Sequence, residues 1–155
     1  MEKRVEDSRT ELVQLLMPQH INGTGRLFGG MLMEWIDVVA GVTARRHSER
    51  NVITAAVDNL QFKAGAYVND TLLLVGRLTY VGNSSMEVRV DTYAEDLSGK
   101  RRPINRAYLV MVALDEEEKP ARVPRLILET EAQIAEWEGG IKRNELRRIR
   151  RVEGY

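Results

Sequence analysis

The 155-residue chain contains no cysteine and only two histidines, two tryptophans and four prolines. Without cysteine it forms no disulfide bond, holds no metal through thiolates and uses no cysteine nucleophile. No apolar run reaches the ~18 residues that a membrane-spanning helix needs, and the first residues carry no apolar signal region. We therefore expect a cytoplasmic protein of one domain, because this length is enough to bury a sizeable core.

Several motifs with known chemistry are also absent. There is no Gly-x-Ser-x-Gly nucleophile elbow, no phosphate-binding Walker loop and no cluster of metal ligands, so we expect no metal. The glycines at Gly23, Gly25 and Gly29 miss the dinucleotide fingerprint by one residue. His20 and His47 have no partner at catalytic spacing, which favours surface or loop roles for both.

Charge is balanced overall, with 23 basic and 23 acidic residues, but it is unevenly distributed. The segment 138–155 holds six basic and three acidic residues, so it carries +3 and the rest of the chain −3. Such a segment is either an anion-binding edge or a solvated helix, and we favour the solvated helix. It has no aromatic interleaving or base-reading motif, so we expect no nucleic-acid partner.

Apolar spacing predicts one long helix and several strands. Met31, Trp35 and Val38 begin a helical pattern that runs to Arg46, with apolar residues on most of its circumference. A short strand over 12–17 precedes it and ends at Pro18. The region 52–114 is β-prone, with a hairpin turn at 82–85 and a central strand over 104–114.

Other details of the pattern give further expectations. Leu72, Leu74, Leu78 and Tyr80 should share one strand face, while Met86 to Asp91 alternates like a half-exposed strand. We expect a helix over 126–137 that ends at Gly139-Gly140, followed by a second basic helix or a frayed tail over 141–152. One buried helix followed by antiparallel strands predicts an α+β fold, a single curved sheet wrapped around the helix.

The segment from Asn22 to Gly30 carries four glycines and leads directly into the long helix. Glycine lets backbone approach a ligand closely, and the first amides of a helix have free N–H groups that favour negative charge. Asp37 lies two turns further on, where a buried carboxylate is expected only if it is paired or used. Together these features predict a site that stabilises an oxyanion and supplies a base.

The spacing of Asn22, Gly29-Gly30 and Asp37, with Leu27-Phe28 before the glycine pair, resembles hotdog-fold acyl-CoA thioesterases of the YciA and brain types. Further matches lie at 54–62, 69–70 and 81–85, and the resemblance covers about 12–124. It implies a hotdog domain, which we place at 1–137, with a basic C-terminal helical extension over 138–155. It also implies hydrolysis of acyl-CoA without a separate cofactor, and a homodimer that assembles further into a tetramer or hexamer.

The resemblance assigns catalytic roles to three residues. The Gly30 N–H would stabilise the oxyanion, Asp37 would act as the general base or, less favoured, as the nucleophile, and Asn22 would orient water or the carbonyl. In relatives the residues that match Asn22 and Asp37 come from opposite subunits. Two helical turns cover about 11 Å, so we expect Asp37 to act on a substrate held by the partner's helix start.

Simpler interpretations stand beside these roles. The glycines could only permit tight helix packing, Asp37 could pair with Arg45 or Arg46, and Asn22 could be a turn residue.

Asp58 is a second candidate carboxylate. Lys63, Arg101, Arg102 and Arg125 are candidates for contacts to CoA phosphates. The predicted substrate-binding and CoA-binding residues are Phe28, Gly29, Lys63, Gly82, Asn83, Ser84 and Ser85. The alternative function is a hotdog protein that binds acyl-CoA as a sensor without catalysis.

Overall fold

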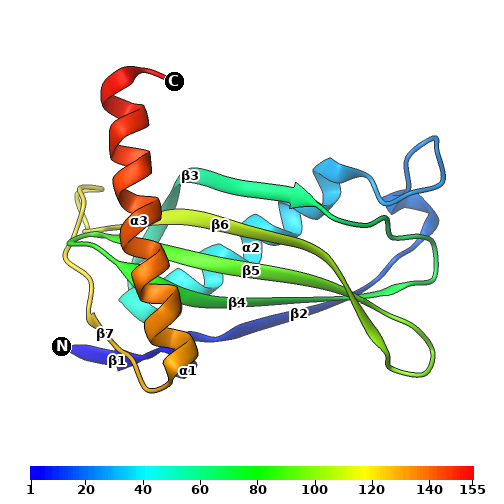
Figure 1. The fold of residues 1–155 in the computed structure, drawn as a ribbon, viewed down its shortest axis with the longest axis horizontal. Coiled ribbons are helices and arrows are strands. Elements are labelled where there is room, and N and C mark those ends of the chain that lie inside the picture. Colours follow the sequence, from blue (N-terminus) through cyan, green and yellow to red (C-terminus); the bar gives the residue numbers. More distant parts are fainter.

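The computed structural model describes all residues from Met1 to Tyr155. In chain order the elements are β1 (Glu2–Arg4), α1 (Val5–Ser8), β2 (Thr10–Leu15), a 3-10 turn (Pro18–His20), α2 (Gly29–Ser48), β3 (Asn51–Phe62), β4 (Thr71–Val81), β5 (Ser85–Glu95), β6 (Arg101–Leu114), β7 (Arg125–Ile127) and α3 (Glu131–Glu153). The main sheet is antiparallel, with strand order β2-β4-β5-β6-β3. It curves around α2, while α3 crosses its opposite face (Figure 1). The expected α+β arrangement of one curved sheet around one long helix is confirmed.

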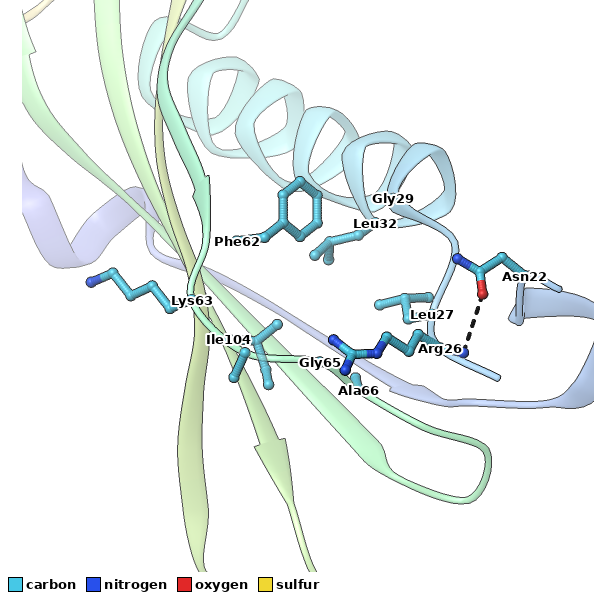
Figure 2. Close-up of a pocket in the computed structure, with 11 residues that line it drawn as sticks. Asn22, Arg26, Leu27, Gly29, Leu32, Phe62, Lys63, Gly65, Ala66 and Ile104 are labelled. Carbon is cyan, nitrogen blue, oxygen red and sulfur yellow. Dashed lines mark hydrogen bonds between the residues drawn. The ribbon is translucent and has the colours of Figure 1, made fainter. Parts of the chain in front are cut away.

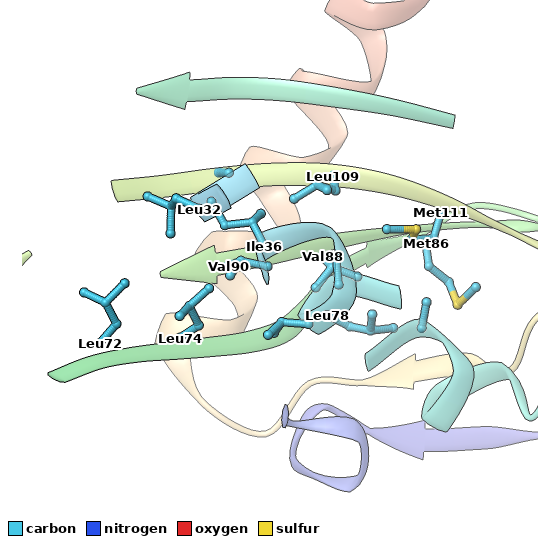
Figure 3. Close-up of a cluster of buried hydrophobic side chains, with 14 of the residues drawn as sticks. Leu32, Ile36, Leu72, Leu74, Leu78, Met86, Val88, Val90, Leu109 and Met111 are labelled. Atoms are coloured by element: carbon cyan, nitrogen blue, oxygen red, sulfur yellow. The ribbon is translucent and has the colours of Figure 1, made fainter. Parts of the chain in front are cut away.

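Helix α2 fills the concave side of the sheet. Its side chains Leu32, Ile36 and Val39 are at most 1% exposed and pack in a core of 21 buried residues with Leu74, Leu78 and other sheet residues (Figure 3). The helix and sheet come close at Gly76 on β4, where an added Cβ would lie 2.7 Å from both Val39 Cγ1 and Thr43 Oγ1. Only glycine permits this distance, so the contact fixes the depth of α2 in the sheet.

The predicted helix and strands are present with small shifts of their ends. Helix α2 extends two residues beyond the predicted range at each end, and the turn at 82–85 joins β4 to β5 as predicted. The short elements β1, α1 and β7 carry no periodic signal and were not predicted. The helix expected to start at Leu126 starts only at Glu131, because residues 125–127 pair with β1 in a parallel ribbon.

The prediction that Gly139-Gly140 ends a helix is wrong. Helix α3 runs without a break through both glycines, and Thr130 caps its start by accepting a hydrogen bond from the Gln133 N–H. An added Cβ at Gly140 would lie 2.6 Å from Tyr80 Cβ. Gly140 therefore serves the close approach of α3 to β4 rather than chain termination. The boundary placed between residues 137 and 138 lies inside this helix.

The face of β5 that was expected to be half-exposed is covered by α3. Glu87 is 2% exposed and accepts hydrogen bonds from Arg143, Arg147 and Thr79. Asp58, which is also buried, forms ion pairs with Arg147 and Arg150. The basic segment is thus a helix with two sides: Arg143, Arg147 and Arg150 reach buried carboxylates, while the other basic residues, Lys142, Arg148 and Arg151, are exposed as expected of a solvated helix. A shift of register between Leu78 and Tyr80 also turns Tyr80 toward Trp137 of α3, away from the face that was predicted for it.

His47 is fully buried near the end of α2, which corrects the surface or loop role expected for it. Its Nε2 lies 2.8 Å from the carbonyl oxygen of Pro124, and its Nδ1 has no hydrogen-bond partner. Burial lowers the pKa of His47 below its ordinary value of 6.5, and it outweighs the hydrogen bond to Pro124, which acts in the opposite direction. The lowered pKa favours the neutral imidazole in the folded protein at neutral pH. None of the three helices has the length and apolar character needed to cross a membrane.

We expect His47 to make stability depend on pH near neutrality. As pH falls through about 6.5, the unfolded chain takes up a proton that the folded protein resists, so the free energy of unfolding decreases. The melting temperature, measured between about pH 7.5 and 5.5, should fall on acidification, and His47→Gln should flatten that slope. His20→Gln is the matched control and should retain it. An unchanged slope in His47→Gln would refute the assignment.

Candidate active site

The first turn of α2 has no protein partner for its leading amides. Phe28 is the N-cap residue and supplies no side-chain acceptor. Its carbonyl accepts hydrogen bonds from the Met31 and Leu32 N–H groups, whereas the N–H groups of Gly29 and Gly30 find no acceptor in the chain. Free amides at the positive end of a helix dipole form a ready site for an oxyanion or another anion.

The two glycines pack differently. An added Cβ at Gly29 would lie 3.5 Å from the ring of Phe62, an ordinary contact, so Gly29 faces β3 without crowding. An added Cβ at Gly30 would lie 2.7 Å from the ring of Phe28, which is half-exposed and folds back over the helix start. Packing thus accounts for part of the need for glycine at position 30, and it leaves both amides open.

Asn22 is a turn residue whose side chain also presents a donor. Its Oδ1 accepts hydrogen bonds from the Thr24 N–H, the Thr24 hydroxyl and the Arg26 N–H. These bonds fix the amide plane, and the amide nitrogen, which donates no hydrogen bond within the chain, points toward the segment that leads into α2 (Figure 2). The turn therefore orients a free N–H donor beside the open amides.

Asp37 lies on the exposed face of α2 and is held by a neutral donor. Its Oδ1 accepts a hydrogen bond of 2.7 Å from the Thr54 hydroxyl on β3, and its Oδ2 has no partner. It forms no ion pair with Arg45 or Arg46, and the Arg46 guanidinium instead donates to the Arg9 carbonyl and the Thr10 hydroxyl. The simpler interpretation of Asp37 as half of a helix ion pair is therefore wrong.

Asp37 and Gly30 line one cavity of about 340 Å³. Glu34 and Thr54 are its other polar residues. The rest of its wall is apolar: Met33, Ile36, Val57, Leu60 and Leu109. An open amide, a carboxylate and a hydroxyl around an apolar cavity can stabilise a polarised carbonyl and activate water.

The structure separates the remaining predicted residues into two groups. Phe28, Gly29 and Lys63 lie at the end of the sheet where α2 begins, and the turn Gly82–Ser85 lies at the opposite end (Figure 1). The registers place Phe62 beside Asn105 and Ser85 beside Val112, seven residue steps along β6, on the order of 20 Å. Within one protomer, these two groups therefore cannot contact the same part of a small ligand.

Three of the four candidate phosphate ligands are engaged in structural contacts. Arg101 pairs with Glu95, and Arg102 pairs with Asp70 and donates to the Gly65 carbonyl. Arg125 donates to the carbonyls of Gly82 and Val123. Only Lys63 has a side chain without an ion pair or hydrogen bond, and it lines a cavity beside the helix start.

Sequence reasoning missed two residues of the site, Thr54, which contacts Asp37, and Arg26, which lies beside the helix start. Thr54 lies in the segment 54–62 that matched the family, but no spacing rule joins a strand threonine to a helix carboxylate. Arg26 was treated only as part of the glycine segment, although its exposed guanidinium lines the same cavity as Asn22 and Lys63. Its position in a glycine-rich turn beside a helix start was the available signal.

A curved antiparallel sheet wrapped around one long helix defines a hotdog protein. The sequence model of the thioesterase superfamily matches residues 24–99. A Bacillus subtilis protein named as an uncharacterized acyl-CoA thioester hydrolase is 38% identical over 130 residues, which cover 83% of this chain and 76% of that protein. The chain belongs to the thioesterase superfamily.

Solved structures agree on the fold. A hexameric acyl-CoA thioesterase has 38% identity and a TM-score of 0.93, with 96% of each chain covered. An acyl-CoA hydrolase from Staphylococcus aureus, solved with butyryl-CoA and CoA, has 34% identity and a TM-score of 0.94 over 99% of this chain and 94% of that chain. The rat cytosolic acyl-CoA thioester hydrolase is 35% identical over 139 residues, and the chain spans 36% of its length. The expected hotdog fold and family are confirmed.

The Staphylococcus aureus hydrolase has also been solved as three single variants, in which an asparagine, an aspartate or a threonine is replaced by alanine. The order and spacing of these three residues in that protein are the same as those of Asn22, Asp37 and Thr54 here. The three polar residues that surround the start and the exposed face of α2 therefore recur as a set in a similar hydrolase.

Two substitutions at Asn22 should separate its roles. Asn22→Ala removes the acceptor of three hydrogen bonds, so the free energy of unfolding should fall by about 1 kcal/mol. Asn22→Asp keeps that oxygen and should stay close to the native stability. Urea unfolding, with hydrogen exchange at the Thr24 and Arg26 amides, measures both effects. Equal losses in the two variants would contradict the turn geometry.

Proposed function

We propose that the protein is an enzyme that hydrolyses the thioester of acyl-CoA to a free acid and CoA. One observation carries this proposal: α2 has at its start a Gly30 amide without an acceptor and, two turns further on, an Asp37 carboxylate with one oxygen free. The names of similar proteins support the substrate class. No separate cofactor is needed for this reaction. We also propose a cytoplasmic location, which the name of the rat relative supports.

In the proposed reaction, Asp37 takes a proton from water as the oxygen attacks the carbonyl carbon of the thioester. The carbonyl electrons move onto its oxygen, where the Gly30 N–H and the Asn22 amide group are available to donate. The C–S bond then breaks, and the CoA sulfur leaves with the proton that Asp37 had accepted. Because the Thr54 hydroxyl holds Oδ1, the free Oδ2 is the atom that contacts the water.

Distance along the helix favours a site shared between two subunits. Gly30 and Asp37 are separated by two turns, about 11 Å, which is long for one carbonyl to contact both. The edge of β3 is unpaired, and its side chains Ile53, Val57 and Phe62 are about half exposed. Exposed apolar edge strands favour pairing with another strand. We propose that β3 pairs with its copy in a homodimer, which assembles further as in the hexameric neighbour.

Antiparallel pairing of β3 with its copy would also explain the separated binding residues. It would place the turn Gly82–Ser85 of one protomer near the helix start of the other, since these lie at opposite ends of the sheet. The proposed CoA path then contains Lys63 from one subunit and the turn residues from its partner. A sensor that binds acyl-CoA without hydrolysis is the second candidate, and turnover distinguishes the two.

A thiol-release assay with a panel of acyl-CoAs should detect turnover. Asp37→Asn should lower kcat by at least about 10²-fold with little effect on KM, because it removes the base and keeps the shape. Thr54→Val should lower kcat less, since it frees a carboxylate that is still present. Asn22→Asp should lose turnover without losing stability. Tight binding of acyl-CoA with no turnover at any chain length would refute the enzyme and support the sensor.

Mixed dimers should test the shared site. Subunits with Asn22→Asp and subunits with Asp37→Asn are each expected to be inactive. After subunit exchange, a heterodimer contains one site with both native residues and one site with neither, so activity should return to about half of the native value per heterodimer. Mass spectrometry of the mixed species checks the exchange. Absence of rescue after verified exchange would place both residues in one subunit's site.

A further inference from the structure

Helix α3 crosses the convex face of the sheet from β4 to the outer strand β3. Gly140 approaches β4, Arg143 binds a carboxylate on β5, and Arg150 binds a carboxylate on β3. One helical turn separates the first two contacts, and two turns separate the last two, which lie on either side of β6. A turn rises about 5.4 Å and neighbouring strands lie about 4.8 Å apart, so the helix advances one strand per turn. At Arg150 it has therefore reached the edge of the sheet.

The last residues of α3 extend beyond that edge. Figure 1 shows the C-terminal end of the helix passing β3, the outer strand, with no further strand of the chain beyond it. The helix nevertheless continues to Glu153 and ends at Gly154, whose N–H donates to the Arg150 carbonyl. Val152 and Tyr155 are 76% and 77% exposed. The helix thus ends in a regular turn that carries apolar side chains and has no strand of its own to pack on.

A cavity of about 500 Å³ separates this helix end from the face of β3 and β6. Val110 and Val112 belong to its apolar floor, and Tyr155 belongs to the wall that α3 supplies. Val57, which is about half exposed on the unpaired strand β3, also lines this cavity. The apolar groups at the end of α3 and at the edge of β3 are therefore neighbours, and both lack a partner within the chain.

The occupant that fits this overhang is a second copy of the chain. A strand that pairs with β3 lies one strand spacing beyond it, which is where the next turn of α3 lies. In the proposed homodimer that strand is the partner's β3. Arg151 and Glu153 form no ion pair within the chain, unlike the other arginines in this half of α3. Because a two-fold interface places the same surface on both sides, each copy offers the opposite charge to the other.

We propose that residues 151–155 of α3 pack on the partner subunit and stabilise the homodimer on its convex side. This contact rests on the β3 pairing included in the proposed function, but not on turnover. Each subunit contributes one helix end and receives the other, so every contact occurs twice about the two-fold axis. Main-chain hydrogen bonds at an edge strand are open to any exposed strand, whereas the side chains at the end of α3 favour a copy of this chain.

Removal of residues 151–155 should weaken the dimer and leave the ion pairs of Arg147 and Arg150 in place. Subunit exchange between isotope-labelled and unlabelled protein, followed by native mass spectrometry, should become at least about tenfold faster, because interface changes act mainly on dissociation. Val152→Glu should act in the same direction. Ile141→Glu is the matched control, since Ile141 is an exposed apolar residue of the same helix above the interior of the sheet, and it should leave the rate unchanged. An unchanged rate in the truncated chain would overturn the contact.

Distances between spin labels test the same contact in the full-length chain. The chain has no cysteine, so Val152→Cys and Ile141→Cys each place one label in a subunit. The label at 141 lies about 16 Å further from the β3 edge along each helix, so the shortest distance between subunits should be roughly 25 Å longer at 141 than at 152.

Both measurements are independent of turnover, so they would support the contact even in a protein that hydrolyses no acyl-CoA. A distance at 152 as long as that at 141, or longer, would overturn the contact together with the β3 pairing, and hydrolysis would be unaffected. A short distance at 152 with an unchanged exchange rate after truncation would overturn the α3 contact alone and retain the pairing of β3.

Discussion

The contact between α2 and β4 at Gly76 is the constraint on which the site depends. It sets the helix at a depth that a side chain at position 76 would prevent, and the contact of His47 with the Pro124 carbonyl holds the far end of the helix. A helix fixed along its length cannot shift to find partners for its first amides. Those amides therefore stay open to a ligand. The packing of α2 in the concave sheet thus leaves free N–H donors at the start of the helix.

The parts predicted from sequence are those in which one residue's environment follows from its neighbours in the chain. Helix α2 is recognisable because its apolar residues recur along one element, and Asn22, Gly30 and Asp37 stand at a spacing that marks a family. The convex face could not be predicted in this way. Alternation of Met86, Glu87 and Val88 is the same whether water or an arginine-rich helix covers the charged side. Gly140 is likewise compatible with a helix end or with a close contact between elements. Only its position against Tyr80 in the structure distinguishes the two.

The residues missed near the site act through partners that are distant in sequence. Thr54 reaches Asp37 from another element, and Arg26 shares its cavity with Lys63, which follows β3. No local pattern encodes such a pairing, because it depends on how β3 lies against α2. Conversely, Arg101 and Arg102 had the right charge for phosphate but the wrong neighbours, since Glu95 and Asp70 already neutralise them. Charge suggests candidates, and packing decides which cations are free.

Carboxylates on the two faces of the sheet differ in burial and in hydrogen-bond partners. On the convex face, Glu87, Asp58 and Asp91 are buried and each is bound by two arginines, which compensates the cost of removing a charge from water. The arginines of Glu87 and Asp58 belong to α3, so these two carboxylates also fix where α3 lies. Asp37 is exposed, has one neutral donor and keeps Oδ2 free. The same functional group therefore serves structure on one face and is available for proton transfer on the other.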